Sequence, residues 1–207
     1  MQSQRERKRN KMQSIYVLKA TDIEKQIKIP EDVKLGLNKL KDQKSRDLYI
    51  ATRLVEKYIL KGREKHITKE GKPYAIEGNR YNLSQVGEYV CVVESEYEVG
   101  IDIAKAQEFT AHFIDRMFLE EEKAQIKNDL DVLKFWTIKE ATTKCVGIGL
   151  KGIRDVKVLS NDKCSYKDQE FNYKSFNFSD YIITVVQKEI IDIDNLTSLK
   201  VIDFINI

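Results

Sequence analysis

The stretch KFWTIKEATTKCVGIGL, residues 134–150, contains the only tryptophan of the chain. On an α-helix, Trp136, Glu140 and Lys144 are spaced i, i+4 and i+8 and therefore share one face, which Lys139 flanks. A solvated helix face is one interpretation, because a Glu-to-Lys pair at this spacing stabilises an isolated helix by about 0.2–0.5 kcal/mol. A tryptophan has no role on a solvated face, and a glycine-rich turn follows, so a functional site is the other interpretation.

The composition is that of a globular protein. With 207 residues, 42% of them hydrophobic, the chain is long enough to bury a core as one domain or two small ones. No apolar run is long enough to span a membrane, and no stretch resembles a signal peptide, so no membrane partner is expected. Cys91, Cys145 and Cys164 show no metal-ligand spacing, which favours reduced thiols and a cytoplasmic location.

The net charge of +3 arises in the first residues of the chain. MQSQRERKRNKMQ, residues 1–13, is strongly basic, and the remainder is close to neutral. A nucleic-acid-binding domain carries its basic excess across a whole face, so no nucleic-acid partner is expected. We predict a disordered basic tail; an arm that binds anions is the alternative.

The hydropathy pattern predicts an α+β protein. A strand is expected in SIYVLK, residues 14–19, and a helix is expected to start at Pro30. Residues 45–62, SRDLYIATRLVEKYILKG, carry apolar side chains at helical spacing and predict a long helix. Residues 69–85, KEGKPYAIEGNRYNLSQ, are expected to be rich in turns, and buried strands are expected after them in GEYVCVVES and EYEVGIDIAK.

The second part of the chain repeats this order. A helical region is expected from about Ala106 to Gly147, in which residues 120–122 form an exposed acidic helix start. Strands are expected after it in IRDVKVLS, FNYKSFNF, DYIITVVQK and LKVIDFI. GEYVCVVE and SDYIITVVQ are alike and occupy corresponding places. We therefore expect two similar α+β halves, residues 14–97 and 98–207, with a ligand cleft between them.

The stretch VGIDIAK, residues 99–105, carries a carboxylate on an apolar strand. The β-branched residues point to one face, and Asp102 points to the other between Gly100 and Ala104, which leave room beside it. A hard cation such as Mg²⁺ needs one or two carboxylates, together with waters and substrate phosphates. An exposed aspartate on an edge strand is the alternative interpretation.

A third pattern, GKPYAIEGNRYNLSQ, combines a Gly-Lys-Pro turn with a small hydroxyl ahead of a buried strand. Lys72 and Ser84 are candidates for holding a phosphate or a base edge. By itself this pattern favours no particular function.

In this order along the chain, the three patterns resemble those of the 4′-phosphopantetheinyl transferases. The similarity is greatest to the longer, monomeric surfactin-synthetase (Sfp) type, and it extends from about Ile15 to Val186. Its most specific part is WTIKEATTK, residues 136–144. The resemblance implies two pseudo-symmetric α+β halves with the active site in the cleft between them.

The resemblance also implies a reaction. Such an enzyme transfers the phosphopantetheine arm of coenzyme A to a serine hydroxyl of an apo acyl or peptidyl carrier protein, releases 3′,5′-ADP and depends on Mg²⁺. Carriers of fatty-acid, polyketide and nonribosomal-peptide synthesis all remain possible partners, and a monomer is expected. A degenerate member that binds coenzyme A or a carrier protein without catalysis is the alternative.

The resemblance assigns roles to residues at matching positions. Asp102 and Glu140 are implied to bind Mg²⁺, and Glu140 is also the candidate base for the serine. Lys144 is implied to contact the pyrophosphate, and Lys139 to support the phosphate charge.

The remaining implied contacts are to coenzyme A. Lys72 and Pro73 correspond to the turn against the adenine, Ser84 to a phosphate contact, and Arg46 to the arginine that grips the 3′-phosphate.

Two positions depart from the family pattern. Gln85 stands where a phosphate-contacting histidine is usual, and Ala104 stands where many members have a third carboxylate. A glutamine amide donates a hydrogen bond but carries no charge, so weaker coenzyme A binding is expected. A water or a nearby acidic residue would have to complete the metal site.

Overall fold

The structure is a computed structural model that describes residues 14–159, 162–191 and 196–199. The basic tail and most of LKVIDFI lie outside these residues. In chain order the helices and strands are β1 (Ser14–Lys19), α1 (Ile23–Gln26), α2 (Glu31–Leu37), α3 (Gln43–Leu60), β2 (Lys65–Ile67), β3 (Pro73–Ala75), β4 (Arg80–Val86), β5 (Tyr89–Ser95), β6 (Val99–Lys105), α4 (Ala111–Met117), α5 (Glu120–Lys123), α6 (Asp129–Val146), a 3₁₀ helix (Leu150–Asp155), β7 (Val156–Val158), β8 (Lys163–Tyr166), β9 (Gln169–Phe178), β10 (Tyr181–Gln187) and β11 (Leu196–Leu199).

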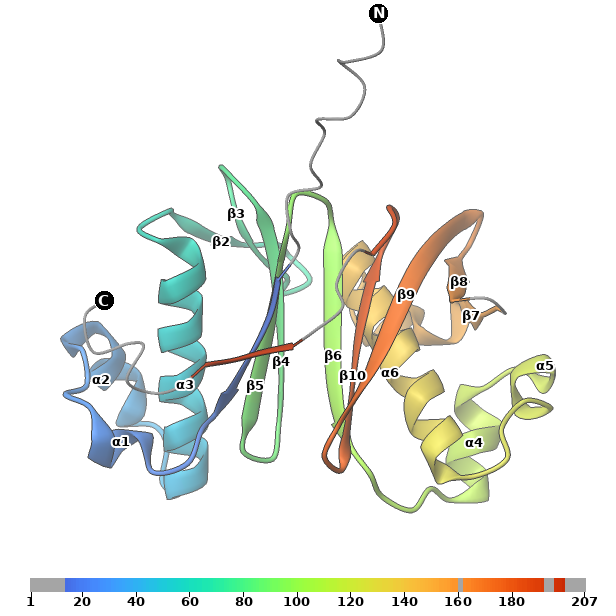
Figure 1. The fold of residues 1–207 in the computed structure, drawn as a ribbon, viewed down its shortest axis with the longest axis horizontal. Helices are drawn as coiled ribbons and strands as arrows, with labels where there is room; N and C mark the ends of the chain where they lie inside the picture. The colour runs from blue at the N-terminus through green and yellow to red at the C-terminus, as the bar shows by residue number, and fades with distance from the viewer. Residues whose placement is uncertain (1–13, 160–161, 192–195, 200–207) are drawn as a thin grey trace, which may run out of the picture.

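Two sheets pack face to face, and each carries one long helix on its outer side (Figure 1). The first sheet has the strand order β11-β1-β5-β4 and is covered by α3. The second has the order β6-β10-β9-β8-β7 and is covered by α6. This confirms the predicted α+β class, with helices segregated from sheets whose strand pairs are antiparallel except for β1 and β11.

The chain passes once from the first sheet to the second and then returns. β1, β4 and β5 precede β6, as the predicted division near residue 98 requires, but β11 pairs in parallel with β1 in the first sheet. β11 therefore belongs to the first sheet, although β6 to β10, which precede it in the chain, form the second sheet. Pseudo-symmetry between residues 14–97 and 98–207 stays a prediction.

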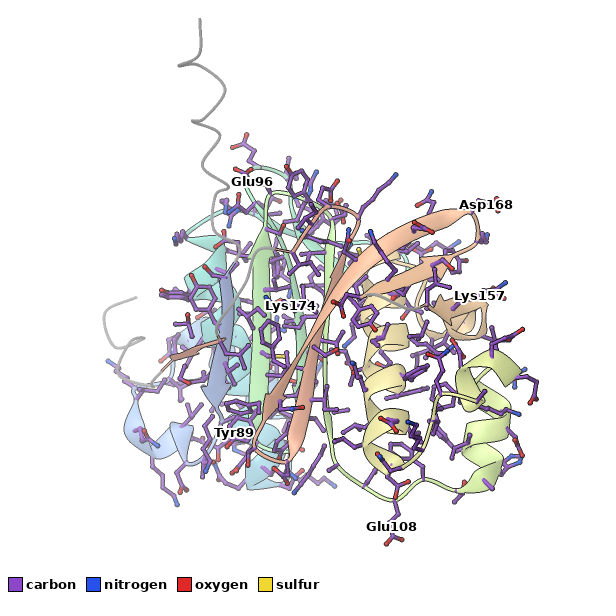
Figure 2. The ribbon with its side chains drawn as sticks, turned by 45° about the vertical axis from the view of Figure 1, so that its right-hand side comes forward. Tyr89, Glu96, Glu108, Lys157, Asp168 and Lys174 are labelled. Carbon is purple, nitrogen blue, oxygen red and sulfur yellow. The ribbon has the colours of Figure 1, made fainter. Side chains whose placement is uncertain are left out.

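The core between the sheets is built from the alternating residues of the predicted strands. Val99, Ile101 and Ile103 of β6 pack there against β1, β5 and β10, as their spacing predicts. Tyr89, at the turn between β4 and β5, stacks edge-on against Tyr181 with ring centroids 5.1 Å apart and closes one end of this core (Figure 2). The three cysteines are free and buried.

Helix α3 begins and ends within two residues of the predicted range 45–62. Helix α6 ends where the sequence predicts, at Gly147, but its start at Asp129 was not predicted, because the expected helical region begins near Ala106. The Asp42 carboxylate caps α3 by accepting from Ser45 N, and Asn128 caps α6 by accepting from Asp131 N. Helix α6 ends at Gly147, which takes the left-handed conformation (φ 78°) that glycine adopts without strain. No helix within the described ranges is both long and apolar enough to cross a bilayer.

Residues 69–85 contain turns, as predicted, but they also form β3 and nearly all of β4, which the sequence reading did not predict. β4 carries Asn82 and Ser84 on the side that faces β6, and both side chains are buried. Asn82 Oδ1 accepts from Ile101 N at 3.0 Å. β4 and β6 belong to different sheets, so this side-chain hydrogen bond connects them where no backbone ladder does. Because these buried positions carry polar side chains, the sequence of β4 lacks the apolar alternation that predicts a strand.

Gly100 allows α6 to lie directly on β6. A Cβ atom at this position would lie 2.0 Å from the Ala141 carbonyl oxygen and 2.5 Å from Cys145 N. Gly100→Ala is expected to lower the free energy of unfolding by about 3 kcal/mol, because backbone atoms of the helix would have to move. Urea unfolding measures this change, and a loss below about 0.5 kcal/mol would contradict the tight packing of α6 on β6.

Candidate active site

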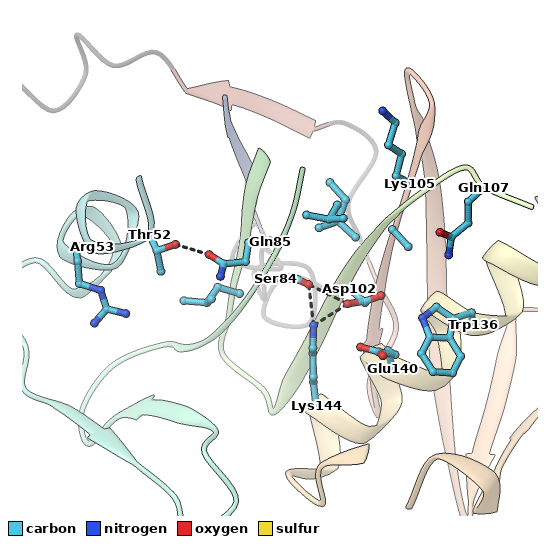
Figure 3. A pocket seen from close by; sticks show the side chains of 14 residues that line it. Thr52, Arg53, Ser84, Gln85, Asp102, Lys105, Gln107, Trp136, Glu140 and Lys144 are labelled. Carbon is cyan, nitrogen blue, oxygen red and sulfur yellow. Dashed lines mark hydrogen bonds and ion pairs between the residues drawn. The ribbon is translucent and has the colours of Figure 1, made fainter. Parts of the chain in front are cut away.

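A cavity of about 570 Å³ lies where the two sheets meet. Helix α3 contributes Thr52 and Arg53 to its wall, β4 contributes residues 83–86, and β6 contributes residues 102–105. Gln107, Trp136, Glu140 and Lys144 complete the lining (Figure 3). The cavity thus joins WTIKEATTK to the strand pattern VGIDIAK and to the NLSQ segment.

Three polar side chains from three elements form a closed triangle in this cavity. Lys144 Nζ donates to Asp102 Oδ1 at 2.7 Å and to Ser84 Oγ at 2.7 Å. Ser84 Oγ donates to the same Asp102 oxygen at 2.8 Å (Figure 3). Asp102 is only 4% exposed, so it is not the exposed edge-strand aspartate of the alternative interpretation. These contacts bring together three of the residues singled out in the sequence.

Glu140 lies one helical turn before Lys144 on the same face of α6 and points into the cavity (Figure 3). Burial, with a further contribution from the Asp102 charge, raises its pKa to about 7, although Lys144 acts in the opposite direction. A carboxyl group with this pKa exchanges a proton readily near neutral pH.

Asp102 and Glu140 are suited to a divalent cation, because both face the cavity, where burial and then the Asp102 charge raise the pKa of Glu140. Within the described ranges no cluster of three or more histidine, cysteine, aspartate or glutamate side chains has metal-binding geometry. Ala104 lines the cavity where a third carboxylate would stand. The donor set therefore fits Mg²⁺, which retains waters and binds substrate phosphates beside one or two carboxylates.

The expectation for Lys139 needs correction. Its side chain is fully buried and points away from the cavity; its ammonium pairs with the buried Glu122 at 2.9 Å. It also donates to the Val156 carbonyl. Consecutive residues of a helix point about 100° apart, so Lys139 cannot share the face of Glu140. Lys139 ties α6 to α5 and β7, and the structure gives it no access to a phosphate in the cavity.

Glu122 itself was expected to be exposed, and that expectation is wrong. Its neighbour Glu120 is largely exposed, whereas Glu122 is 1% exposed and accepts from Val158 N at 2.7 Å and Leu119 N at 2.9 Å. The sequence shows three consecutive glutamates, and nothing in it indicates which of the three side chains is buried.

Arg46 does not reach the cavity either. Its guanidinium forms an ion pair with Glu24 and donates to the Leu37 carbonyl at 3.1 Å. Two helical turns later on α3, Arg53 does line the cavity. Its Nη1 lies 2.9 Å from Glu56 Oε2, while its Nε has no partner. Sequence reasoning overlooked Arg53, although it lies on the same face of the same helix.

The GKP turn lies beside the cavity but not in its wall. Lys72 Nζ contacts Glu98 Oε2 at 2.6 Å and donates to the Cys145 carbonyl at 2.7 Å, and Pro73 begins β3. A cation at the carbonyl end of α6 is favoured by the helix dipole. Lys72 thus fastens the β2–β3 hairpin to α6, and its predicted adenine contact stays a prediction.

Gln85 lines the cavity on the α3 side. The Thr52 hydroxyl lies 2.7 Å from Gln85 Oε1, which holds the amide carbonyl toward the helix (Figure 3). The amide NH₂ group remains as a neutral donor at the position where the family pattern has a histidine.

Comparison with known proteins points to the same residues. Residues 98–189 match the family described as the 4′-phosphopantetheinyl transferase superfamily. This segment contains the WTIKEATTK stretch and the Asp102 carboxylate. The similarity to the superfamily covers this segment, which is less than half of the chain.

Three curated proteins of the superfamily illustrate the similarity. The chain is 33% identical over 86 residues to 4′-phosphopantetheinyl transferase gsp of Aneurinibacillus migulanus, covering 39% of this chain and 36% of that protein. It is 31% identical over 108 residues to the L-aminoadipate-semialdehyde dehydrogenase-phosphopantetheinyl transferase of Candida glabrata, covering 44% of this chain and 41% of that protein. It is 29% identical over 100 residues to the holo-[acyl-carrier-protein] synthase of Campylobacter fetus, covering 42% of this chain and 86% of that protein. The match thus spans well under half the length of the first two relatives.

Proposed function

We propose that the protein transfers the 4′-phosphopantetheine arm of coenzyme A to a serine hydroxyl of an apo acyl or peptidyl carrier protein and releases 3′,5′-ADP. The observation that carries this proposal is the convergence of Ser84, Asp102, Glu140 and Lys144 on one cavity. Two of these side chains come from the helix that bears the most specific part of the family pattern.

In this proposal the cavity binds the diphosphate of coenzyme A by charge and hydrogen bonding. Asp102 and Glu140 would hold Mg²⁺, which would neutralise the leaving bisphosphate. The Lys144 ammonium, the Ser84 hydroxyl and the Gln85 amide supply donors to the phosphate oxygens. Phosphoryl transfer needs mainly positioning and charge stabilisation, and these side chains offer both.

Glu140 is the proposed catalytic base. A serine hydroxyl is a weak nucleophile, and a base must take its proton directly or through one water. Glu140 lines the cavity next to the proposed diphosphate position, and its pKa of about 7 lets it accept a proton and release it to solvent.

For the contact to the 3′-phosphate, the geometry favours Arg53 over Arg46. Arg46 would have to leave Glu24 to reach a ligand in the cavity, whereas Arg53 already lines it. We therefore place the 3′-phosphate at the α3 end of the cavity.

The pH dependence of transfer follows from Glu140. Since the base must be deprotonated, kcat/KM is expected to fall about tenfold per pH unit below pH 7 and to level off above it. Bound Mg²⁺ would shift the midpoint to lower pH. A series of initial rates between pH 5 and 9 tests this, and a rate that increases toward acid pH would contradict a carboxylate base.

A catalytically inactive member of the superfamily is the second candidate. The observation that favours it is Ala104 in the cavity wall, which leaves two carboxylates for the metal. Such a protein would bind coenzyme A or a carrier without modifying the carrier. Incubation with coenzyme A, Mg²⁺ and apo carrier proteins separates the candidates, because only the enzyme increases the carrier mass by one phosphopantetheine group.

The partners and location remain proposals of the same kind. We propose a cytoplasmic protein that acts as a monomer on a separate carrier domain, because residues of one chain line the whole cavity.

A further inference from the structure

Lys144 occupies the carboxylate oxygen that a metal ion would need. Asp102 Oδ1 accepts from Lys144 Nζ at 2.7 Å and from Ser84 Oγ at 2.8 Å. A carboxylate oxygen offers two lone pairs, so these two donors saturate it. A cation can bind this oxygen only when one donor leaves.

The second oxygen of Asp102 offers no easy alternative. A divalent cation there would lie close to the Lys144 ammonium in a site where Asp102 is 4% exposed. Like charges repel strongly where little water screens them. The ammonium therefore opposes cation binding at either oxygen of the carboxylate.

Lys144 is placed so that it can move while Asp102 cannot. Its side chain is 28% exposed and lines the cavity, whereas that of Asp102 is 5% exposed within β6. Rotation about the lysine side-chain bonds carries the ammonium into the cavity without disturbing the helix backbone.

We propose that Lys144 is a built-in competitor for divalent cations at Asp102, so that the cation site opens only when the ammonium moves to an anion in the cavity. This rests on the proposed function, in which the anion is the diphosphate of coenzyme A. Cation and diphosphate binding are then coupled through one side chain, and the cavity does not retain a free metal ion tightly.

The proposal is tested with Mn²⁺ alone, whose free concentration is measured by electron paramagnetic resonance. Lys144→Met keeps the aliphatic length of the side chain and removes its charge. We expect this variant to bind Mn²⁺ at least tenfold more tightly than the wild-type protein. Lys144→Gln serves as a second variant, and circular dichroism confirms the fold of both.

Lys105 provides a matched control. It lines the same cavity, but its ammonium pairs with Asp180 at 3.3 Å rather than with Asp102. Lys105→Met makes the same change in net charge, and we expect it to alter Mn²⁺ affinity less than threefold. Asp102→Asn combined with Lys144→Met should abolish the gained affinity.

The proposal is overturned if Lys144→Met and Lys144→Gln bind Mn²⁺ no more tightly than wild type, or if Lys105→Met tightens binding equally. Failure of the proposed function looks different. In that case the wild-type protein modifies no carrier, yet the gain in Mn²⁺ affinity still appears.

Discussion

Glu140→Gln is expected to lower the rate of phosphopantetheine transfer by at least about a hundredfold while the protein stays folded. The amide keeps the size of the side chain but can neither accept the serine proton nor bind a metal ion as a carboxylate does. Initial rates at saturating coenzyme A measure this loss. Glu108→Gln is the matched control, because Glu108 is exposed, projects from the surface (Figure 2) and is not part of the cavity wall, so this variant should keep wild-type rates.

The same substitution should make the protein more stable. The pKa of Glu140 is about 7 in the folded protein and near 4.5 in the unfolded chain. The folded state therefore binds more protons between these values, and its stability decreases as the pH rises through them. Above pH 7, Glu140→Gln should raise the free energy of unfolding by about 2 kcal/mol, after allowance for partial solvent exposure.

A Glu140→Gln variant that is more stable but inactive would show that this carboxylate is needed for the transfer reaction and not for folding. Denaturant unfolding at pH 5 and pH 8 checks the stability, and the gain should shrink at the lower pH. Transfer at near-wild-type rates would remove Glu140 from the mechanism, and a loss of stability at pH 8 would contradict its raised pKa.

Lys139→Met is expected to lower the free energy of unfolding by about 3–5 kcal/mol. The substitution leaves Glu122 buried with its negative charge and only backbone donors from Leu119 and Val158. Removing one partner of a buried ion pair is costly because the other stays desolvated. Urea unfolding measures the change.

The nearby pair between Lys123 and Glu120 is the control for Lys139. Its atoms lie at the same distance of 2.9 Å, but the Glu120 side chain is 87% exposed. Lys123→Met should cost less than about 1 kcal/mol, since exposed ion pairs contribute little. Equal losses for Lys139→Met and Lys123→Met would contradict a structural role for the buried pair and reopen the prediction that Lys139 serves the phosphates.

Residues that repeat an apolar pattern could be placed from the sequence. The apolar run in β5, the alternation in β6 and the helical spacing in α3 and α6 predicted these elements, and the Asp102 side chain lies on the face that its spacing indicates. The same spacing predicted that Glu140 and Lys144 share a helix face. Local patterns suffice here because a continuous apolar run marks a strand that is buried on both faces, as β5 and β6 are.

The remaining features depend on contacts between distant segments. β4 was missed because Asn82 and Ser84 satisfy their polar groups across the sheet boundary on β6. Arg53 rather than Arg46 reaches the cavity because Glu24, far away in the chain, neutralises Arg46. A single sequence records such partners as ordinary charged or polar residues, so only the fold distinguishes them.

The most direct test of the account is the mass of an apo carrier protein after incubation with the 207-residue protein, coenzyme A and Mg²⁺. We predict that at least one acyl or peptidyl carrier gains one phosphopantetheine group on its serine. The gain should disappear with Glu140→Gln and persist with Glu108→Gln. If every carrier retains its apo mass in the presence of folded wild-type protein, the proposed transfer reaction is contradicted.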